Sequence, residues 1–225
     1  MKRQNVIGVD LAKNVIQASV VTPAGKEQIN RAFTRKQFAE FLVRQSPSLV
    51  AFEACATAHY WARVAQSYGH SAKILPAKAV APFRQGHKTD PNDALAIAET
   101  AQRPNIKEAP MKTVEQQGLQ AIRRSRELLI QDRTALSNHI RGLLMEFGVV
   151  IPKGFASLHR HLPEILEDGE NGVPDLYRPT LNLMHGRLIT LKSDIDILNE
   201  QIDALVKQNA ACERLTRIEG IGPIG

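Results

Sequence analysis

Short apolar runs separated by polar breaks occupy the first third of the chain and predict β-strands. These runs cover residues 5–10, 15–21, 27–33, 49–53 and 73–75. Apolar residues at helical spacing, Phe38, Phe41 and Leu42, follow the third run, and residues 60–68 have the pattern of a second helix. Strands that alternate with helices after an initial β-hairpin predict an α/β fold, a mixed sheet flanked by helices, over roughly residues 1–110.

The pattern changes to long helices beyond Pro110. Apolar residues three and four apart predict the first helix: Leu119, Ile122, Leu129, Leu136, Ile140, Leu143 and Phe147. Arg126 and Arg133 interrupt this stripe, so we expect them to face a groove, a partner or a ligand. A second stripe has the same spacing without a break and predicts a coiled-coil seam: Leu181, Met184, Leu188, Leu191, Ile195, Leu198, Ile202 and Leu205.

Residues 148–179 separate the two helices and contain four prolines, which predicts a loop-rich connector. The two helices could pair within one chain or across a dimer, because the seam is compatible with both arrangements. The sequence therefore divides into an α/β domain at residues 1–110, a helical region at residues 111–210 and a short segment at residues 211–225.

The formal net charge of +6 is distributed unevenly along the chain. Residues 1–110 carry +7, residues 111–141 carry +3 and residues 142–225 carry −4, which favours a polyanion such as nucleic acid as a partner of the first two regions. No apolar run approaches the roughly 20 residues of a membrane span, and no export signal is visible. Cys55 and Cys212 are far apart, so we expect a cytoplasmic protein without disulfides or membrane attachment.

Four carboxylates lie at positions that favour metal binding. Asp10 ends the first strand and Glu53 ends the strand after the first helix, and neighbouring parallel strands would bring both to one sheet edge. Asp90 and Asp93 are three residues apart, which puts both on one face of a helical turn. Mg²⁺ prefers oxygen ligands, and two ions about 4 Å apart can clamp the attacking and leaving oxygens of a phosphodiester. The four residues therefore predict a metal-dependent site that cleaves nucleic acid.

These carboxylates also have structural interpretations. Asp90 precedes Pro91 and could be a helix N-cap, with Asp93 at the third helical position, where the helix dipole favours an anion. Asp10 could simply turn the chain at the end of a strand. Glu53 is harder to explain in this way, because it follows four apolar residues where an unpaired charge would be costly.

Three blocks of this sequence resemble a known family. The three blocks of the DEDD transposases of bacterial insertion sequences are similar to Ile7–Asp10, Phe52–Ala54 with Thr57 and Tyr60 downstream, and Lys88–Ala94. That family includes site-specific DNA invertases and RNA-guided bridge recombinases. The similarity covers about residues 5–110 and the helical region.

The resemblance implies an RNase H-like (RuvC-like) fold in which Asp10, Glu53, Asp90 and Asp93 are catalytic and hold Mg²⁺, which Mn²⁺ could replace. It also implies a transposase or recombinase that cleaves and exchanges DNA strands, guided by a structured RNA that the element encodes. The expected assembly of this chain is a dimer or a dimer of dimers, formed through the coiled coil.

In that family, a C-terminal domain supplies a serine nucleophile. Residues 217–223 resemble the opening of this domain, a Gly-x-Gly hairpin at Gly220 and Gly222 whose backbone amides could bind a DNA phosphate. The family's serine has no counterpart before Gly225. The resemblance therefore implies a truncated chain that binds metal and nucleic acid but is not expected to complete recombination.

Basic residues in two regions are the expected nucleic-acid contacts. Those that precede Asp90 are Arg84, His87 and Lys88. Those on the first long helix are Arg123, Arg124, Arg126, Arg133 and Arg141. A solvated helix face would explain the helical arginines equally well.

Two other functions fit parts of the sequence. A sugar kinase or actin-like ATPase also begins with a strand, an Asp and a hairpin, but it needs small residues after that Asp to hold phosphates. Residues 11–14, Leu-Ala-Lys-Asn, contain no glycine. A non-catalytic scaffold that dimerises through residues 181–205 and binds nucleic acid is the second alternative, and it would not need Asp10 or Asp93 for metal binding.

Overall fold

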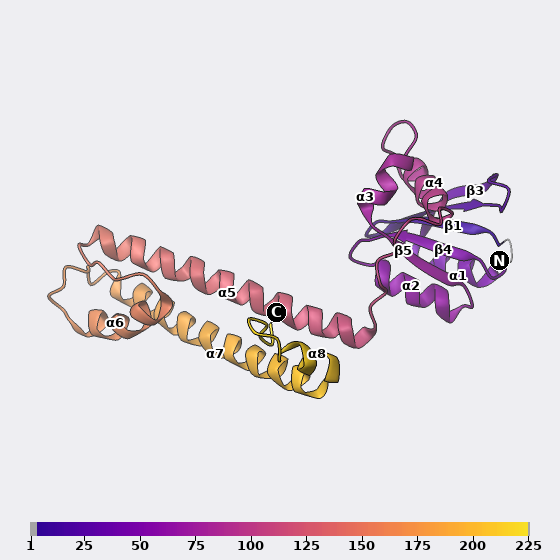
Figure 1. Ribbon diagram of the computed structural model, residues 1–225. Helices are drawn as coiled ribbons and strands as arrows, with labels where there is room; N and C mark the ends of the chain where they lie inside the picture. The colour runs from indigo at the N-terminus through magenta and orange to yellow at the C-terminus, as the bar shows by residue number, and fades with distance from the viewer. Residues whose placement is uncertain (1–3, 225) are drawn as a thin grey trace. The chain divides into compact units, whose positions relative to one another are not determined.

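The computed structural model describes residues 4–224, and the chain separates into two compact units, Met1–Thr113 and Val114–Gly225 (Figure 1). Unit 1 contains one five-stranded sheet in the order β3-β2-β1-β4-β5. Its strands are β1 (Val6–Leu11), β2 (Val15–Val21), β3 (Glu27–Thr34), β4 (Leu49–Glu53) and β5 (Ser71–Leu75). β1, β2 and β3 are antiparallel neighbours, whereas β1, β4 and β5 are parallel. This is the RNase H-like arrangement that the sequence predicts.

Helices cover both faces of the sheet (Figure 1). They are α1 (Arg35–Arg44), α2 (Ala58–Ser67), α3 (Ala77–Val80), the 3₁₀ turn η1 (Ala81–Phe83) and α4 (Asp90–Ala101). The helices α1 and α2 pack on one face against Val9 and Phe52, while α4 packs on the other face with Ala51. Because successive residues of a strand point to opposite faces, each strand contributes to both cores.

Local sequence signals explain where these helices begin and end. Thr34 and Gln37 form a capping box at the start of α1, in which each side chain accepts a hydrogen bond from the other residue's backbone N–H. Gly69 follows α2 with a φ of 86°, a conformation that residues with a Cβ rarely adopt. The chain therefore turns there into β5.

A close contact between a helix and the sheet lies at Gly8 in β1. A Cβ at this position would lie 2.2 Å from the carbonyl oxygen of Ala94 and 2.4 Å from the backbone nitrogen of Ala98. The missing side chain therefore lets the backbone of α4 lie directly on β1, two residues before Asp10.

Unit 2 is built around two long helices that lie side by side (Figure 1). Its helices are α5 (Val114–Glu146), α6 (Phe155–Glu167), α7 (Arg178–Gln208) and α8 (Ala210–Leu215). Ile140 and Leu144 of α5 share a buried cluster with Leu181 and Leu188 of α7, and further along the pair the Arg126 side chain donates to Asn199. The helices are thus antiparallel and pair within one chain, one of the two arrangements that the seam allowed.

The apolar seam of α7 follows the predicted spacing except at its end. Leu181, Leu188, Leu191, Ile195 and Ile202 are buried. Val206 is buried at the last turn instead of Leu205, which is 39% exposed. The seam therefore shifts by one residue where α7 approaches its end.

Two segments differ from the sequence interpretation. The loop-rich connector at residues 148–179 contains the 13-residue helix α6, which forms despite Pro163 because its Leu158 and Leu162 are fully buried. The predicted Gly-x-Gly hairpin is also not a β-hairpin, because residues 216–224 form turns and contain no strand. Gly220 has a φ of 85° in one of these turns.

Across residues 4–224, no helix combines the length and the apolar character that crossing a bilayer requires.

Gly8→Ala is expected to destabilise unit 1 by about 1–3 kcal/mol, because overpacking forces the backbone of α4 away from β1. The measurement is chemical denaturation followed by circular dichroism. Gly142→Ala is the control, since Gly142 lies within α5 with open space around its Cβ position, and alanine there should stabilise by about 0.5–1 kcal/mol. Equal stability of Gly8→Ala and the parent chain would contradict the close contact.

Candidate metal centre

Asp10 and Glu53 are neighbours at the ends of two parallel strands. β1 and β4 pair in a register that places Val9 opposite Phe52, so the next residues of the two strands are Asp10 and Glu53. Val9 and Phe52 are fully buried, whereas both carboxylates are half-buried. The two strands therefore place Asp10 and Glu53 side by side at the edge of the hydrophobic core, as predicted.

Asp90 and Asp93 both lie in the first turn of α4. The helix begins at Asp90 itself, and the N-cap residue is Thr89, whose side chain makes no capping hydrogen bond. The interpretation of Asp90 as an N-cap is therefore wrong. Asp93 is 8% exposed, while Asp90 is exposed to solvent.

Electrostatic interactions couple Asp10 to the other three acidic residues. Burial raises the pKa of the Asp10 carboxyl above its ordinary value, and the negative charges of Asp93, Asp90 and Glu53 raise this pKa further. A backbone hydrogen bond from Leu11 partly opposes these effects. Asp10, Glu53, Asp90 and Asp93 therefore form one carboxylate cluster whose members repel one another.

One cation of the chain already contacts this cluster. Arg84, which follows η1, forms an ion pair with Asp93 through its Nε atom, and both side chains are largely shielded from solvent. Within residues 4–224, no three Asp, Glu, His or Cys side chains are grouped tightly enough to hold a metal ion as they lie.

The donor set nevertheless fits a hard divalent cation. Mg²⁺ and Mn²⁺ bind carboxylate oxygens in preference to other protein ligands. A cation would also remove the repulsion that raises the pKa of Asp10. The elements β1, β4 and α4 carry Asp10, Glu53 and Asp93, respectively.

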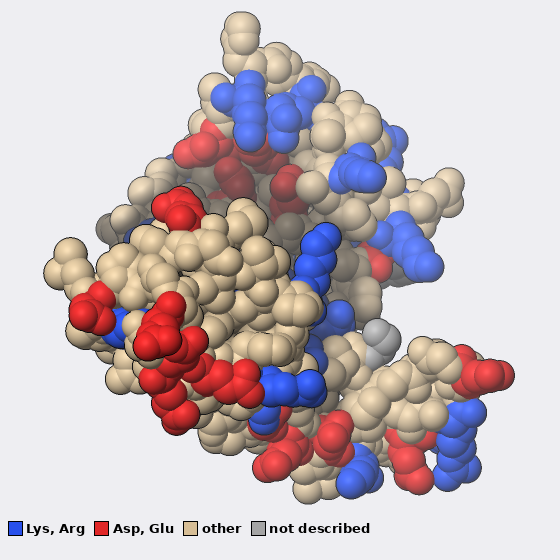
Figure 2. Space-filling view, turned by 90° about the vertical axis from the view of Figure 1, so that its left-hand side faces the viewer, with Lys and Arg blue, Asp and Glu red and all other residues tan. Residues whose placement is uncertain are grey.

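The predicted basic residues near the cluster lie in the segment before α4. His87 holds this segment through its backbone carbonyl, which accepts a hydrogen bond of 2.9 Å from Asn92. Lys88 is exposed. In the upper part of Figure 2, Lys and Arg side chains gather beside a group of Asp and Glu side chains. Basic groups are thus available around an acidic site.

The predicted arginines of α5 have different surroundings. Arg126 donates a hydrogen bond to Asn199 of α7, and the guanidinium of Arg133 lies over the ring of Phe155, 4.6 Å from its centroid. Both face neighbouring helices, which explains why they interrupt the apolar stripe. Arg123 is exposed and pairs with Glu127, and Arg124 is also exposed. Arg123 and Arg124 are therefore better placed than Arg126 and Arg133 to contact a nucleic-acid backbone.

Sequence reasoning missed a polar network beside the carboxylate cluster. Gln17 and Ser19 of β2 are buried although they are polar, and they connect to Glu27 and Asn30 of β3. The signal was available, because polar residues alternate with apolar ones in β2 on a face that a helix covers. Alternation alone, however, also describes a strand with a solvated face.

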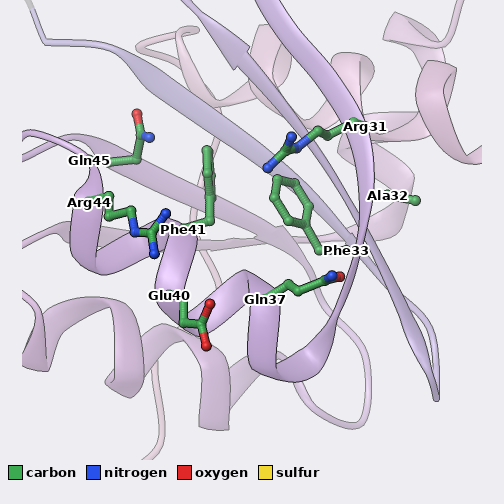
Figure 3. A pocket seen from close by; sticks show the side chains of 8 residues that line it. All are labelled: Arg31, Ala32, Phe33, Gln37, Glu40, Phe41, Arg44 and Gln45. Carbon is green, nitrogen blue, oxygen red and sulfur yellow. The ribbon is translucent and has the colours of Figure 1, made fainter.

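A separate depression of about 300 Å³ lies between β3 and α1 (Figure 3). It is lined by Arg31, Ala32, Phe33, Gln37, Glu40, Phe41, Arg44 and Gln45. Phe33 and Phe41 belong to the core of the α1–α2 face, whereas Asp10 points toward the α4 face. The depression is therefore not part of the carboxylate cluster.

Comparisons with known proteins show which family this chain resembles in sequence. The sequence profile of a transposase family of the DEDD type found in IS110 elements matches residues 7–148. A probable family 20 transposase of Pseudomonas aeruginosa is 39% identical over 219 residues, which are 97% of this chain and 65% of that protein. The transposase of insertion sequence element IS1111A of Coxiella burnetii is 34% identical over 99% of this chain and 61% of its own length. The chain thus spans less than two thirds of these relatives.

Among solved structures, T. thermophilus RuvC in complex with a Holliday junction substrate is similar with a TM-score of 0.38 and 17% identity. The alignment covers 47% of this chain and 99% of that one.

Asp10→Asn is expected to stabilise the metal-free chain at pH 7. Because the pKa of Asp10 is raised in the folded chain, the folded state binds its proton more tightly than the unfolded state, and stability falls as the pH rises above the ordinary value of 3.8. Thermal unfolding in the presence of a chelator should show a higher midpoint for the variant at pH 7 and a smaller difference at pH 4. Asp203→Asn, on the exposed side of α7, is the control. A lower midpoint for Asp10→Asn at pH 7 would show that its surroundings stabilise the charge.

Proposed function

Because the chain belongs to the IS110-type family of DEDD transposases, we propose that its carboxylate cluster binds Mg²⁺, or Mn²⁺ in its place, to cleave and exchange strands of DNA. The observation that carries this proposal is the convergence of four acidic side chains from β1, β4 and α4 at one edge of the sheet. A stable fold gains nothing from such repulsion, which is typical of a functional site. The proposed substrate is DNA, and the proposed location is the cytoplasm.

All four carboxylates are proposed metal ligands, and three of them have distinct parts in this proposal. Asp10 and Glu53 are fixed by neighbouring strands and would hold the cation from the sheet side. Asp93 would exchange the guanidinium of Arg84 for the metal. Mg²⁺ when bound would polarise the scissile phosphate and stabilise the leaving oxygen. Arg84, once released, would be free to pair with a phosphate of the substrate.

The remaining partners follow from the resemblance. The attacking hydroxyl is proposed to come from a serine of the family's C-terminal domain. The positive charge of residues 1–110 supports nucleic-acid binding, and the family resemblance suggests a guide RNA among the bound molecules. Arg84, Lys88, Arg123 and Arg124 are the residues that we propose for these contacts.

Metal binding tests the proposed function directly. We expect calorimetry to detect Mg²⁺ or Mn²⁺ binding by the parent chain and to show at least about a 100-fold loss in Asp10→Asn and Asp93→Asn, because even changes behind a ligand cost 10–100-fold. Asp203→Asn, at matched folding, should bind as the parent does. The titrations are made with and without duplex DNA.

Loss of binding in both variants would establish one shared metal site. Unchanged binding in the variants, or no binding by the parent even with DNA, would instead favour a non-catalytic scaffold that binds nucleic acid.

We also propose that unit 2 forms a homodimer through an exposed groove between α5 and α7. The groove has a volume of about 650 Å³, and Leu129, Leu183 and Leu191 are among its lining residues. Leu183 is 73% exposed, and Ile197, on the same side of α7, is 50% exposed. Asp132, Arg187 and Asp194 also line the groove, so two copies related by a two-fold axis could pair opposite charges.

Leu183→Glu is expected to convert a dimer to a monomer, because it places a charge in the apolar contact. Light scattering coupled to size-exclusion chromatography measures the mass. The control is Leu176→Glu, since Leu176 precedes α7 and is 92% exposed, and this variant should remain dimeric. A monomeric parent, or a dimer that survives Leu183→Glu, would contradict the proposed interface.

A further inference from the structure

The sheet face that carries Asp10 also bears a row of polar side chains, of which those on β2 are buried. Gly8, Ser19 and Asn30 stand opposite one another across β1, β2 and β3. Gln17 lies two residues before Ser19 and opposite Asp10, so it shares this face. Ser19 is fully buried and Gln17 is 6% exposed. Buried polar groups of this kind destabilise a fold unless their hydrogen bonds are made.

Asn30 joins the members of this row. Its Nδ2 atom donates to Glu27 Oε1 at 2.7 Å, and its Oδ1 atom accepts from Gln17 Nε2 at 2.7 Å. Ser19 donates to the same oxygen of Glu27 at 2.7 Å. The side chain of Asn30 is therefore held on both sides, which leaves little freedom in the direction of its amide.

The fixed amide of Asn30 reaches α4. Its Nδ2 atom also donates to the carbonyl oxygen of Pro91, at 3.0 Å. Pro91 lies between Asp90 and Asp93 in the first turn of the helix. The second point of contact is Gly8, where the backbone of α4 touches β1 at Ala94 and Ala98. Two points along α4 therefore define both its distance from the sheet and the place of its first turn.

We propose that Asn30 is a positioning residue that holds the first turn of α4, and with it Asp90 and Asp93, beside Asp10 and Glu53. The inference rests on the proposed metal site and goes beyond it, because Asn30 itself supplies no charge to the cluster. Repulsion among the carboxylates favours movement of the first turn away from the sheet. The hydrogen bond to Pro91 opposes this movement, because it ties the backbone between the two aspartates to β3.

Asn30→Ala tests this role in the whole chain. Calorimetry with Mn²⁺ should show affinity about 3- to 10-fold weaker than in the parent, the loss expected when one hydrogen bond of ordinary net strength no longer holds the ligands together. Gln28→Ala is the control, since Gln28 is exposed on the same strand. Its Mn²⁺ affinity should equal that of the parent.

Hydrogen–deuterium exchange in metal-free buffer gives a second, independent result. Amides of residues 88–95 should exchange about 3- to 10-fold faster in Asn30→Ala, while those of α1 should be unchanged. Asn30→Leu serves where the alanine variant does not fold, because it is uncharged and similar in size but cannot donate to Pro91. The same changes in affinity and exchange are expected for it.

The outcomes separate this inference from the proposed function. Faster exchange in residues 88–95 together with weaker Mn²⁺ binding supports the positioning role. Parent-like affinity in both Asn30 variants overturns it, whatever their exchange or thermal stability, and leaves the metal site intact. A parent chain that binds no Mn²⁺ contradicts the proposed function. In that case the exchange measurement alone tests the role of Asn30, and parent-like exchange of residues 88–95 overturns it.

Discussion

The contact between the backbone of α4 and Gly8 is the constraint on which the architecture of unit 1 depends. A helix that rests on a strand without an intervening side chain lies closer to the sheet than one held off by apolar side chains. This short distance brings Asp93, one residue before Ala94, over the end of β1, where Asp10 lies. The same approach lets Asn30 reach the backbone of Pro91. One missing methyl group therefore determines both the packing of α4 and the place of two acidic side chains.

The packing of unit 1 brings together carboxylates whose charges repel one another. Burial of Asp10 and the like charges of Asp93, Asp90 and Glu53 disfavour the ionised carboxylate in the folded chain, and both raise the pKa of Asp10, with burial the larger cause. Three features position the cluster: the register of β1 and β4, the close packing of the α4 backbone against Gly8, and the ion pair of Arg84 with Asp93. Arg84 supplies positive charge that the proposed metal would otherwise provide. A site of this kind gains stability from its ligand, because binding removes repulsion that folding alone cannot remove.

Unit 2 follows a different physical principle. Its long helices gain their stability from one another, because Ile140 and Leu144 of α5 bury against Leu181 and Leu188 of α7. Arg126 and Arg133 are accommodated in this contact by a hydrogen bond to Asn199 and by the ring of Phe155. α6 completes the cluster at the end where the two helices are joined. The apolar side chains that remain exposed, such as Leu183, are those that the pairing within one chain does not use.

The sequence by itself determined the strands, the long helices and the identity of the candidate ligands. Periodicity suffices for elements such as β2 and α7, because a period of two or of three and four residues specifies which side of an element is buried. The blocks around Asp10, Glu53 and Asp93 could also be identified from the sequence, because together they resemble the three blocks of the DEDD transposases. Only the tertiary structure decided that α5 and α7 pair within one chain, that α6 forms around Pro163, and that α4 begins at Asp90. It alone showed the role of Gly8 and the bond from Asn30 to Pro91. The physical reason is that these features depend on contacts between segments distant in sequence, such as β3 and α4, and no local pattern encodes which atoms will meet across that distance.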